Sequence, residues 1–237
     1  MEPGPFKNTI LRHLDADIIE RLRLRPLQLE VKHALQVPGE PIKQLYFVEA
    51  GIGSMTTVFR NGFQVEVGMF GYESVVGVSG LMGTKRSLNS TFMQLAGHGF
   101  ASPMRAARAE FERHEKFHSL ALRYVQAQLT QATQSAACNA HHHHNQRLAR
   151  WLLICADRSE QQNFKMSHQY LAEMLGSTRQ TVSSAASDLK HKGLIDYRRG
   201  TVFILDHKGL ETEACECYQV VKSHLENVTE FDTGFAV

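Results

Sequence analysis

The residues best suited to bind another molecule lie between positions 179 and 184. Arg179 and Gln180 carry planar groups that can hydrogen-bond to the edges of DNA bases, and an arginine in this place can bind guanine in a bidentate manner. Ser183 and Ser184 follow one helical turn later, so all four side chains would share one face of a helix. The pattern favours base recognition in the major groove, with Arg179 as the guanine contact.

Three small or apolar residues upstream and within this segment would position the helix. Ala172 allows two helices to approach closely, Gly176 suits a tight left-handed turn, and Val182 anchors the second helix in a core. This spacing predicts a helix-turn-helix. A helical hairpin used only for packing is the alternative.

Hydroxyl side chains mark the start of both predicted helices. Ser167 is the expected N-cap of the first helix, and Ser177 or Thr178 the expected N-cap of the second. Such helix starts also lie where DNA phosphates bind. We therefore count all three residues as DNA-binding candidates.

A basic-tipped hairpin is predicted after the second helix. Residues 194–197 and 201–205 read as two strands, with Arg198, Arg199 and Gly200 at the turn. Arginines at this place would meet phosphates or a minor groove, because they stand outside the recognition helix. The predicted unit is therefore a winged helix-turn-helix.

The charge distribution agrees with this prediction. The whole chain is nearly neutral, with 26 basic and 24 acidic residues. Residues 165–208 hold seven lysines and arginines against four acidic residues, whereas residues 209–237 hold one lysine against six. Positive charge is thus concentrated where a DNA contact is predicted.

The N-terminal part has the pattern of short strands. Residues 15–22 predict a helix, and residues 27–101 consist of apolar runs separated by Gly, Pro and Asn. Asn61-Gly62 between two such runs predicts a hairpin. Several short strands at regular spacing indicate a β-barrel or jelly roll.

Residues 104–157 lack Gly and Pro and predict long helix, interrupted near residues 139–145, where we place a hinge. One face is apolar and the opposite face carries glutamines. Pairing with a second chain is the preferred explanation of the apolar stripe, and packing on the chain's own β domain is the alternative. The stripe is Phe117, Leu120, Tyr124, Ala127 and Leu129; the glutamines are Gln126, Gln128, Gln131 and Gln134.

The expected fold class is therefore α+β. We predict an effector-sensing β domain over residues 1–109, a dimerisation helix and hinge over 110–143, and a winged helix-turn-helix domain over 144–237.

This order of elements resembles the Crp/Fnr superfamily of transcription regulators, whose N-terminal domain is a jelly roll of the cyclic-nucleotide-binding type. The resemblance covers nearly the whole chain. It implies a homodimer on a two-fold site in double-stranded DNA, with RNA polymerase as a partner. It places Arg179 and Gln180 on base-reading positions and Ser167 and Gln169 on phosphate-facing ones, and Ser184 stands where the cyclic-AMP receptor has arginine. The matching segments are VPGEPIKQLYFVEAG (37–51), FGYESVVG (70–77), QRLARWLL (146–153) and GSTRQTV (176–182).

The resemblance also indicates where an effector would bind. Cyclic-nucleotide-binding members use a Gly-Glu pair and an Arg-Ser pair, which correspond here to Gly71 with Glu73 and to Arg86 with Ser87. A tyrosine is inserted in the first pair, and the second follows at a longer interval. An unknown small molecule, or none, is therefore favoured over a cyclic nucleotide.

Metal, redox and enzyme functions are the alternatives. The run His141–His144 and the cysteines leave a metal- or redox-responsive regulator open, but no thiol or carboxylate is expected near the run, so no metal site is assigned. Four cysteines, none near the N-terminus, favour neither an iron–sulfur cluster nor disulfides. Haem ligation by His98, His114 or His118, metal binding by His114 with His118, and a cupin-type metalloenzyme are not expected.

Neither a signal peptide nor an apolar run long enough for a membrane span is evident. The sequence therefore predicts a cytoplasmic protein without a membrane partner.

Overall fold

The computed structural model describes residues 5–229. Residues 1–4 of the predicted first domain and residues 230–237 of the predicted last domain lie outside this range. The chain forms two compact units. Unit 1 comprises the described parts of Met1–Gly53, Phe70–Thr130 and Ser223–Val237, and unit 2 comprises Ser54–Met69 and Gln131–Lys222.

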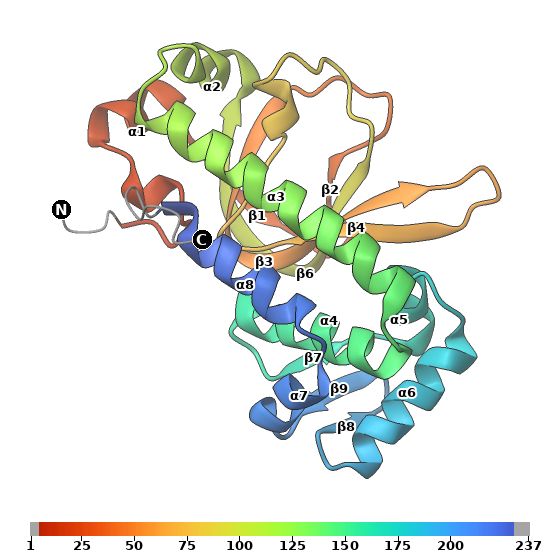
Figure 1. Ribbon diagram of the computed structural model, residues 1–237. Coiled ribbons are helices and arrows are strands. Elements are labelled where there is room, and N and C mark those ends of the chain that lie inside the picture. The colour runs from red at the N-terminus through yellow and green to blue at the C-terminus, as the bar shows by residue number, and fades with distance from the viewer. Residues whose placement is uncertain (1–4, 230–237) are drawn as a thin grey trace. The chain divides into compact units, whose positions relative to one another are not determined.

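An antiparallel sheet forms the N-terminal part of the fold, as the sequence predicted (Figure 1). Its order is β1-β6-β3-β4, with β2 paired to β6 and β5 paired to β3. Gly97 and Gly99 allow β6 to lie against β3, because a Cβ atom at Gly99 would come within 2.2 Å of the Phe47 carbonyl oxygen. The strands are β1 (Arg25–Leu29), β2 (Ala34–Gln36), β3 (Gln44–Val58), β4 (Gln64–Phe70), β5 (Val75–Val76) and β6 (Ser90–Pro103).

The predicted hairpin at Asn61-Gly62 is confirmed. It joins β3 to β4, and Gly62 has a φ of 81°. The Phe59 N–H donates to the Phe63 carbonyl over 2.8 Å, so the connection is longer than the two residues that the Asn-Gly signal alone would require.

Three helices complete unit 1. They are α1 (Ala16–Leu22), α2 (Met104–Phe111) and the first part of α3 (Lys116–His141), with short 3₁₀ helices at Leu11–His13, Val78–Gly80 and Asn227–Thr229. Their apolar faces form one core with the strands, in which the Phe47 and Phe117 rings lie 6.4 Å apart. The helix predicted at residues 15–22 is confirmed.

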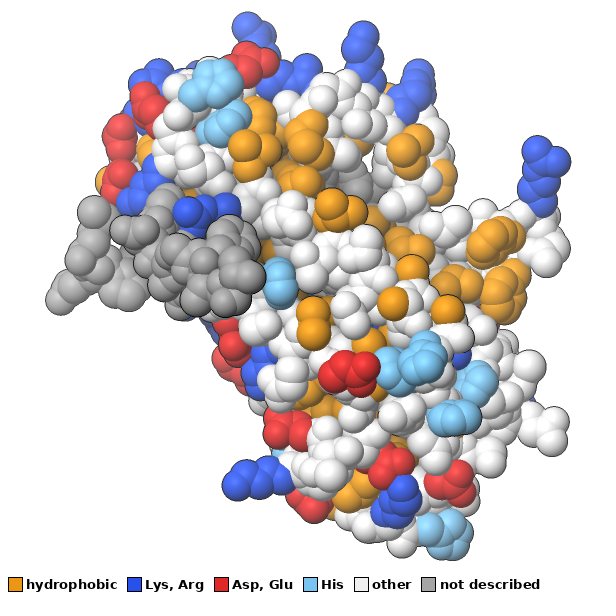
Figure 2. Space-filling model, in the orientation of Figure 1, with side chains coloured by type: hydrophobic (Ala, Val, Ile, Leu, Met, Phe, Trp, Pro, Cys, Tyr) orange, Lys and Arg blue, Asp and Glu red, His pale blue; other side chains and the backbone are white. Residues whose placement is uncertain are grey.

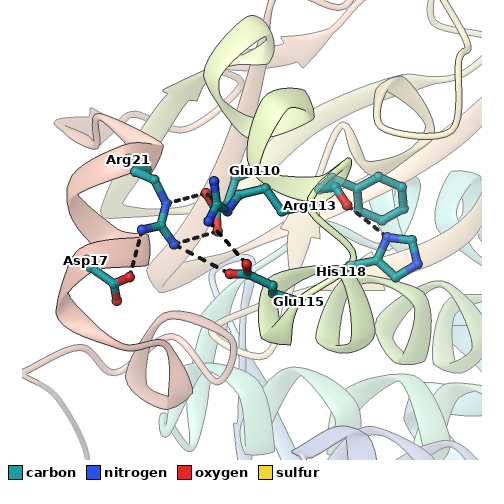
Figure 3. Close-up of polar contacts among 7 residues, drawn as sticks. Asp17, Arg21, Glu110, Arg113, Glu115 and His118 are labelled. Carbon is teal, nitrogen blue, oxygen red and sulfur yellow. Dashed lines mark hydrogen bonds and ion pairs between the residues drawn. The ribbon is translucent and has the colours of Figure 1, made fainter.

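The prediction of one continuous helix from residue 104 onwards is wrong, because α2 ends at Phe111 and α3 begins at Lys116. His114 has a φ of 59°, which ends the helical path although neither Gly nor Pro is present. Arg21 of α1 bonds to Glu110 with Nε 2.6 Å from Oε2, and a second guanidinium nitrogen approaches Glu115 at 3.8 Å (Figure 3). Glu110 is buried near the end of α2, so this ion pair joins the end of α2 to α1 just before the break.

The two faces of α3 also differ from the prediction. Phe117, Leu120, Tyr124 and Ala127 are buried in the core of unit 1, whereas Leu129 is 56% exposed. The stripe therefore packs mainly inside its own chain, as the alternative interpretation held.

Gln131 was expected to face water and is buried instead. In unit 2 its amide nitrogen donates to the Met69 carbonyl over 3.1 Å, and its oxygen accepts from Arg158 over 2.7 Å. Burial is tolerated because both ends of the amide are hydrogen-bonded.

Unit 2 contains the C-terminal helices and a small sheet. The helix is interrupted within the predicted segment 139–145, because α3 ends at His141 and α4 begins at His144. That this break acts as a hinge stays a prediction. The elements are α4 (His144–Ser159), β7 (Asn163–Lys165), α5 (His168–Met174), α6 (Arg179–His191), β8 (Ile195–Arg198), β9 (Thr201–Ile204), α7 (His207–Glu213) and the first part of α8 (Cys217–Glu226).

The β3–β4 hairpin contacts α4 through a half-buried carboxyl group. Glu66 accepts a hydrogen bond from the Trp151 indole over 3.0 Å and another from Ser54. Burial raises the pKa of Glu66 to about 7, although these hydrogen bonds and the nearby arginines oppose the shift. The folded protein therefore binds a proton here more tightly than the unfolded chain.

We expect this carboxyl group to make stability depend on pH. Because the pKa of Glu66 is raised, folding loses stability as pH rises from about 4.5 to about 7, by roughly 1–3 kcal/mol. Glu66→Gln keeps the hydrogen-bonding shape but does not ionise. Melting curves of both proteins between about pH 5 and about pH 8 should diverge, with the wild type falling relative to the variant. Parallel curves would contradict this assignment.

Candidate nucleic-acid interface

The predicted helix-turn-helix is present at α5 and α6. Ser167 caps α5 by accepting from the Tyr170 N–H over 3.1 Å. Gly176 makes the turn with a φ of 58°. Thr178, and not Ser177, caps α6 by accepting from the Thr181 N–H over 3.2 Å.

One face of α6 is buried and the other is exposed. Val182 is fully buried and packs in the domain core, so its helix cannot rotate about its axis without opening that core. The opposite face exposes Arg179, Gln180 and Ser184 to solvent. The predicted base-reading residues thus share one accessible surface near the start of the helix.

Two further candidates already have partners within the domain. Ser183 is half-buried, and its Oγ lies 2.8 Å from Nδ1 of His168. Gln169 is exposed and donates to Glu173 over 3.1 Å. A DNA contact by either residue would have to replace or share these hydrogen bonds.

The wing is confirmed as the β8–β9 hairpin. Arg199 and Gly200 both adopt positive φ, 48° and 78°, as a tight two-residue turn requires. Lys190, and then Arg198, lowers the pKa of Asp196 to about 2. Arg198 is therefore paired with a carboxylate, and exposed Arg199 at the turn is the better placed of the two for a phosphate.

A third strand of the wing sheet was missed from the sequence. β7 pairs with β9, which places Lys165 opposite Thr201, and Thr201 opposite Arg198 on the next strand. Lys165 is exposed and adds positive charge to this row. The sequence does contain a signal for this strand, because apolar Phe164 and Met166 alternate with charged Lys165, and both apolar side chains are buried.

The four effector candidates lie in unit 1 and are held by separate contacts. Glu73 is buried, and its Oε1 accepts from the Gly71 N–H over 3.1 Å. Arg86 donates to the Gly39 carbonyl over 2.6 Å. Ser87 donates to the Asn89 carbonyl over 2.8 Å. Within the described part of the chain a cavity of about 260 Å³ lies nearby, and of the four candidates only Ser87 lines it. The geometry does not reproduce a shared cradle for a cyclic phosphate.

The histidines considered as metal or haem ligands belong to several separate segments of the chain. His98 is exposed on β6. The His114 and His118 rings lie 4.5 Å apart, and Nδ1 of His118 is 2.9 Å from the Phe111 carbonyl oxygen (Figure 3). His141 and His144 belong to different helices, so they do not share a helical face.

Within residues 5–229, no helix is both long and apolar enough to cross a membrane.

Comparisons with known proteins agree with this geometry. Residues 146–213 match the Crp-like helix-turn-helix domain family. The chain is 28% identical over 198 residues to the global nitrogen regulator of Synechococcus elongatus, covering 77% of this chain and 87% of that protein.

Solved structures show the same fold. A transcriptional regulator of the crp/fnr family from Eubacterium rectale aligns with a TM-score of 0.68 at 16% identity, over 86% of this chain and 96% of that one. The c-di-GMP-responsive global regulator CLP of Xanthomonas campestris aligns with a TM-score of 0.64 at 21% identity, over 80% and 99%.

Proposed function

We propose that this chain, a Crp/Fnr-type transcription regulator, binds double-stranded DNA sequence-specifically as a homodimer in the cytoplasm, with RNA polymerase as a partner and no catalytic activity of its own. The observation that carries the proposal is the exposed face of α6 beside the basic wing, inside the domain that matches the Crp-like family. Arg179 and Gln180 read bases, while Arg199 and the helix starts at Ser167 and Thr178 bind phosphates.

An apolar seam on α3 supports the homodimer. The seam residues recur at alternating intervals of three and four, the spacing of a two-helix coiled coil, and Val125 alone among them is half-buried. Surface hydrophobic side chains follow the course of α3 (Figure 2). The seam differs from the apolar stripe that the sequence suggested, because most residues of that stripe are buried in the core of unit 1. It consists of Leu122, Val125, Leu129, Ala132 and Ala136.

Leu129→Glu should convert the dimer to a monomer, because two carboxylates would be placed in an apolar seam. Sedimentation analysis measures the mass, and binding to a two-fold DNA site should weaken in parallel. Val31→Glu is the matched control, because Val31 is 55% exposed and Leu129 is 56% exposed. A Leu129→Glu protein that stays dimeric would rule out this seam.

We infer that any effector acts in unit 1 and is not a cyclic mononucleotide. The separate contacts of Arg86 and Glu73 support this, and so does the cavity lined by apolar Leu35 and Tyr46 as well as Ser87. An effector can shift the protein only as far as it binds one conformation better than another.

A genome-fragment binding selection with the purified full-length protein tests the function directly. It is run without nucleotide, with cyclic AMP and with cyclic GMP. Recovery of one two-fold motif in all three conditions is the expected result. A motif that appears only with a nucleotide would instead support cyclic-nucleotide binding at Arg86 and Ser87. If no motif is enriched, even when cell extract is added as a source of effector, the proposed DNA recognition is wrong.

A further inference from the structure

Three cysteines and one histidine meet at one place in unit 2. Cys138 lies in the last turns of α3, and His142 follows the end of that helix. Cys215 lies between α7 and α8, and Cys217 begins α8. Their sulfur and nitrogen atoms all lie within 4.8 Å of one another. The expectation that no thiol lies near the histidine run is therefore wrong. Cys138 stands only four residues before His142 in the sequence, and folding adds Cys215 and Cys217 from a distant segment.

The distances in this thiol–histidine cluster resemble the edges of a tetrahedron around a metal ion. The Cys138 and Cys215 sulfur atoms are 3.6 Å apart, and the Cys217 sulfur is 3.5 Å from Nδ1 of His142. Zinc bonds of about 2.3 Å to sulfur and about 2.0 Å to nitrogen give tetrahedral edges of about 3.8 Å and about 3.6 Å. These two edges are therefore already near the spacing that zinc requires, and the remaining ligand atoms lie within 4.8 Å of one another.

Neighbouring side chains are oriented as partners of metal ligands. Nε2 of His142 lies 3.3 Å from a Glu216 carboxylate oxygen, which leaves Nδ1 directed to the cysteines. The Gln134 amide donates to the Cys217 sulfur over 3.1 Å. Contacts of these two kinds fix the histidine tautomer and stabilise a thiolate in metal sites.

Two buried arginines provide compensating positive charge. Arg147 and Arg150 are 6% and 7% exposed, and among the described residues neither pairs with an aspartate or glutamate. Both arginines lie in the first two turns of α4, which begins at His144, two residues after His142. Three thiolates with a divalent cation leave one negative charge, which two such arginines stabilise in a buried site.

We propose that Cys138, His142, Cys215 and Cys217 bind a zinc ion as a closed, four-ligand site. Three cysteines and one histidine are a donor set that zinc favours, and four protein ligands leave no open position for catalysis. The ion would join the end of α3, at the break before α4, to the start of α8. This proposal does not depend on the DNA-binding function.

The direct test is the metal content of the full-length protein, purified under reducing conditions through a tag without histidine. Elemental mass spectrometry should find about one zinc ion per chain. After chelation, titration with cobalt should produce the visible and charge-transfer absorption of tetrahedral cobalt thiolate. Chelation should also lower the melting temperature, because metal binding contributes to folding.

Matched variants locate the ion. Cys217→Ser and His142→Ala should each lose most of the zinc, whereas Cys155→Ser and His141→Ala should keep it. Cys155 is buried against Met69 outside the cluster, and His141 is an exposed member of the histidine run. Circular dichroism checks that the serine variants are folded. If a variant does not fold, the zinc content of the wild-type protein still tests the proposal.

Three results would overturn the proposal. The first is reduced wild-type protein that retains no zinc and takes up no cobalt. The second is equal loss of zinc in His141→Ala and His142→Ala, which would mean adventitious binding by the histidine run. The third is a Cys138–Cys215 disulfide, or iron with acid-labile sulfide, in place of zinc.

Discussion

Arg179→Ala should weaken binding to the selected DNA site by roughly 5- to 150-fold, equivalent to about 1–3 kcal/mol, and relax the preference at one base pair. The side chain is exposed at the first residue of α6, where a guanidinium can reach guanine N7 and O6. Fluorescence anisotropy with the wild-type site and with single-base variants measures both effects.

Arg199→Ala is the matched control because it also removes one exposed arginine, but from the wing turn. It should weaken binding to all sequences alike and flatten the dependence of affinity on salt concentration. If Arg179→Ala changed neither affinity nor base preference, the assignment of α6 as the recognition helix would be wrong.

Phe117→Ala should lower the free energy of unfolding by about 3–5 kcal/mol, since it removes a large buried ring and leaves a cavity. Phe117 is fully buried in the core of unit 1, near Phe47 and between the sheet and the helices. Urea denaturation followed by circular dichroism measures the loss.

Leu122→Ala on the same helix is the control for Phe117→Ala. Leu122 is 42% exposed and belongs to the proposed dimer seam, so its truncation should change monomer stability little and dimer affinity more. Both variants are compared at low protein concentration, where the protein is monomeric. If they lose similar amounts of unfolding free energy, the assignment of Phe117 to the core and Leu122 to the dimer seam would be contradicted.

The helix-turn-helix could be predicted because its determinants are local. Ser167, Thr178 and Gly176 act on backbone groups within a few residues of themselves, and the tip of the wing requires only its own turn. The same holds for the hairpin at Asn61-Gly62. For these elements the order of residues along the chain contains nearly all the physical information.

The candidate site was predicted less completely than its scaffold. The exposure of Arg179 and Gln180 followed from helical periodicity, but the pairing of Arg198 with Asp196 and the hydrogen bond between Ser183 and His168 depend on how strands and helices pack. These contacts decide which predicted residues are available to DNA, and no spacing rule contains them.

By itself, the amino-acid sequence determined the class of fold, the helix-turn-helix with its wing, the break in the helix before α4 and the face of α6 that meets solvent. Only the tertiary structure decided the break before α3, the burial of Gln131 and the meeting of Cys138 with Cys215. The physical reason is range: turns, caps and helical faces depend on neighbours in the chain, whereas ion pairs, buried amides and metal ligands join residues that only folding brings together.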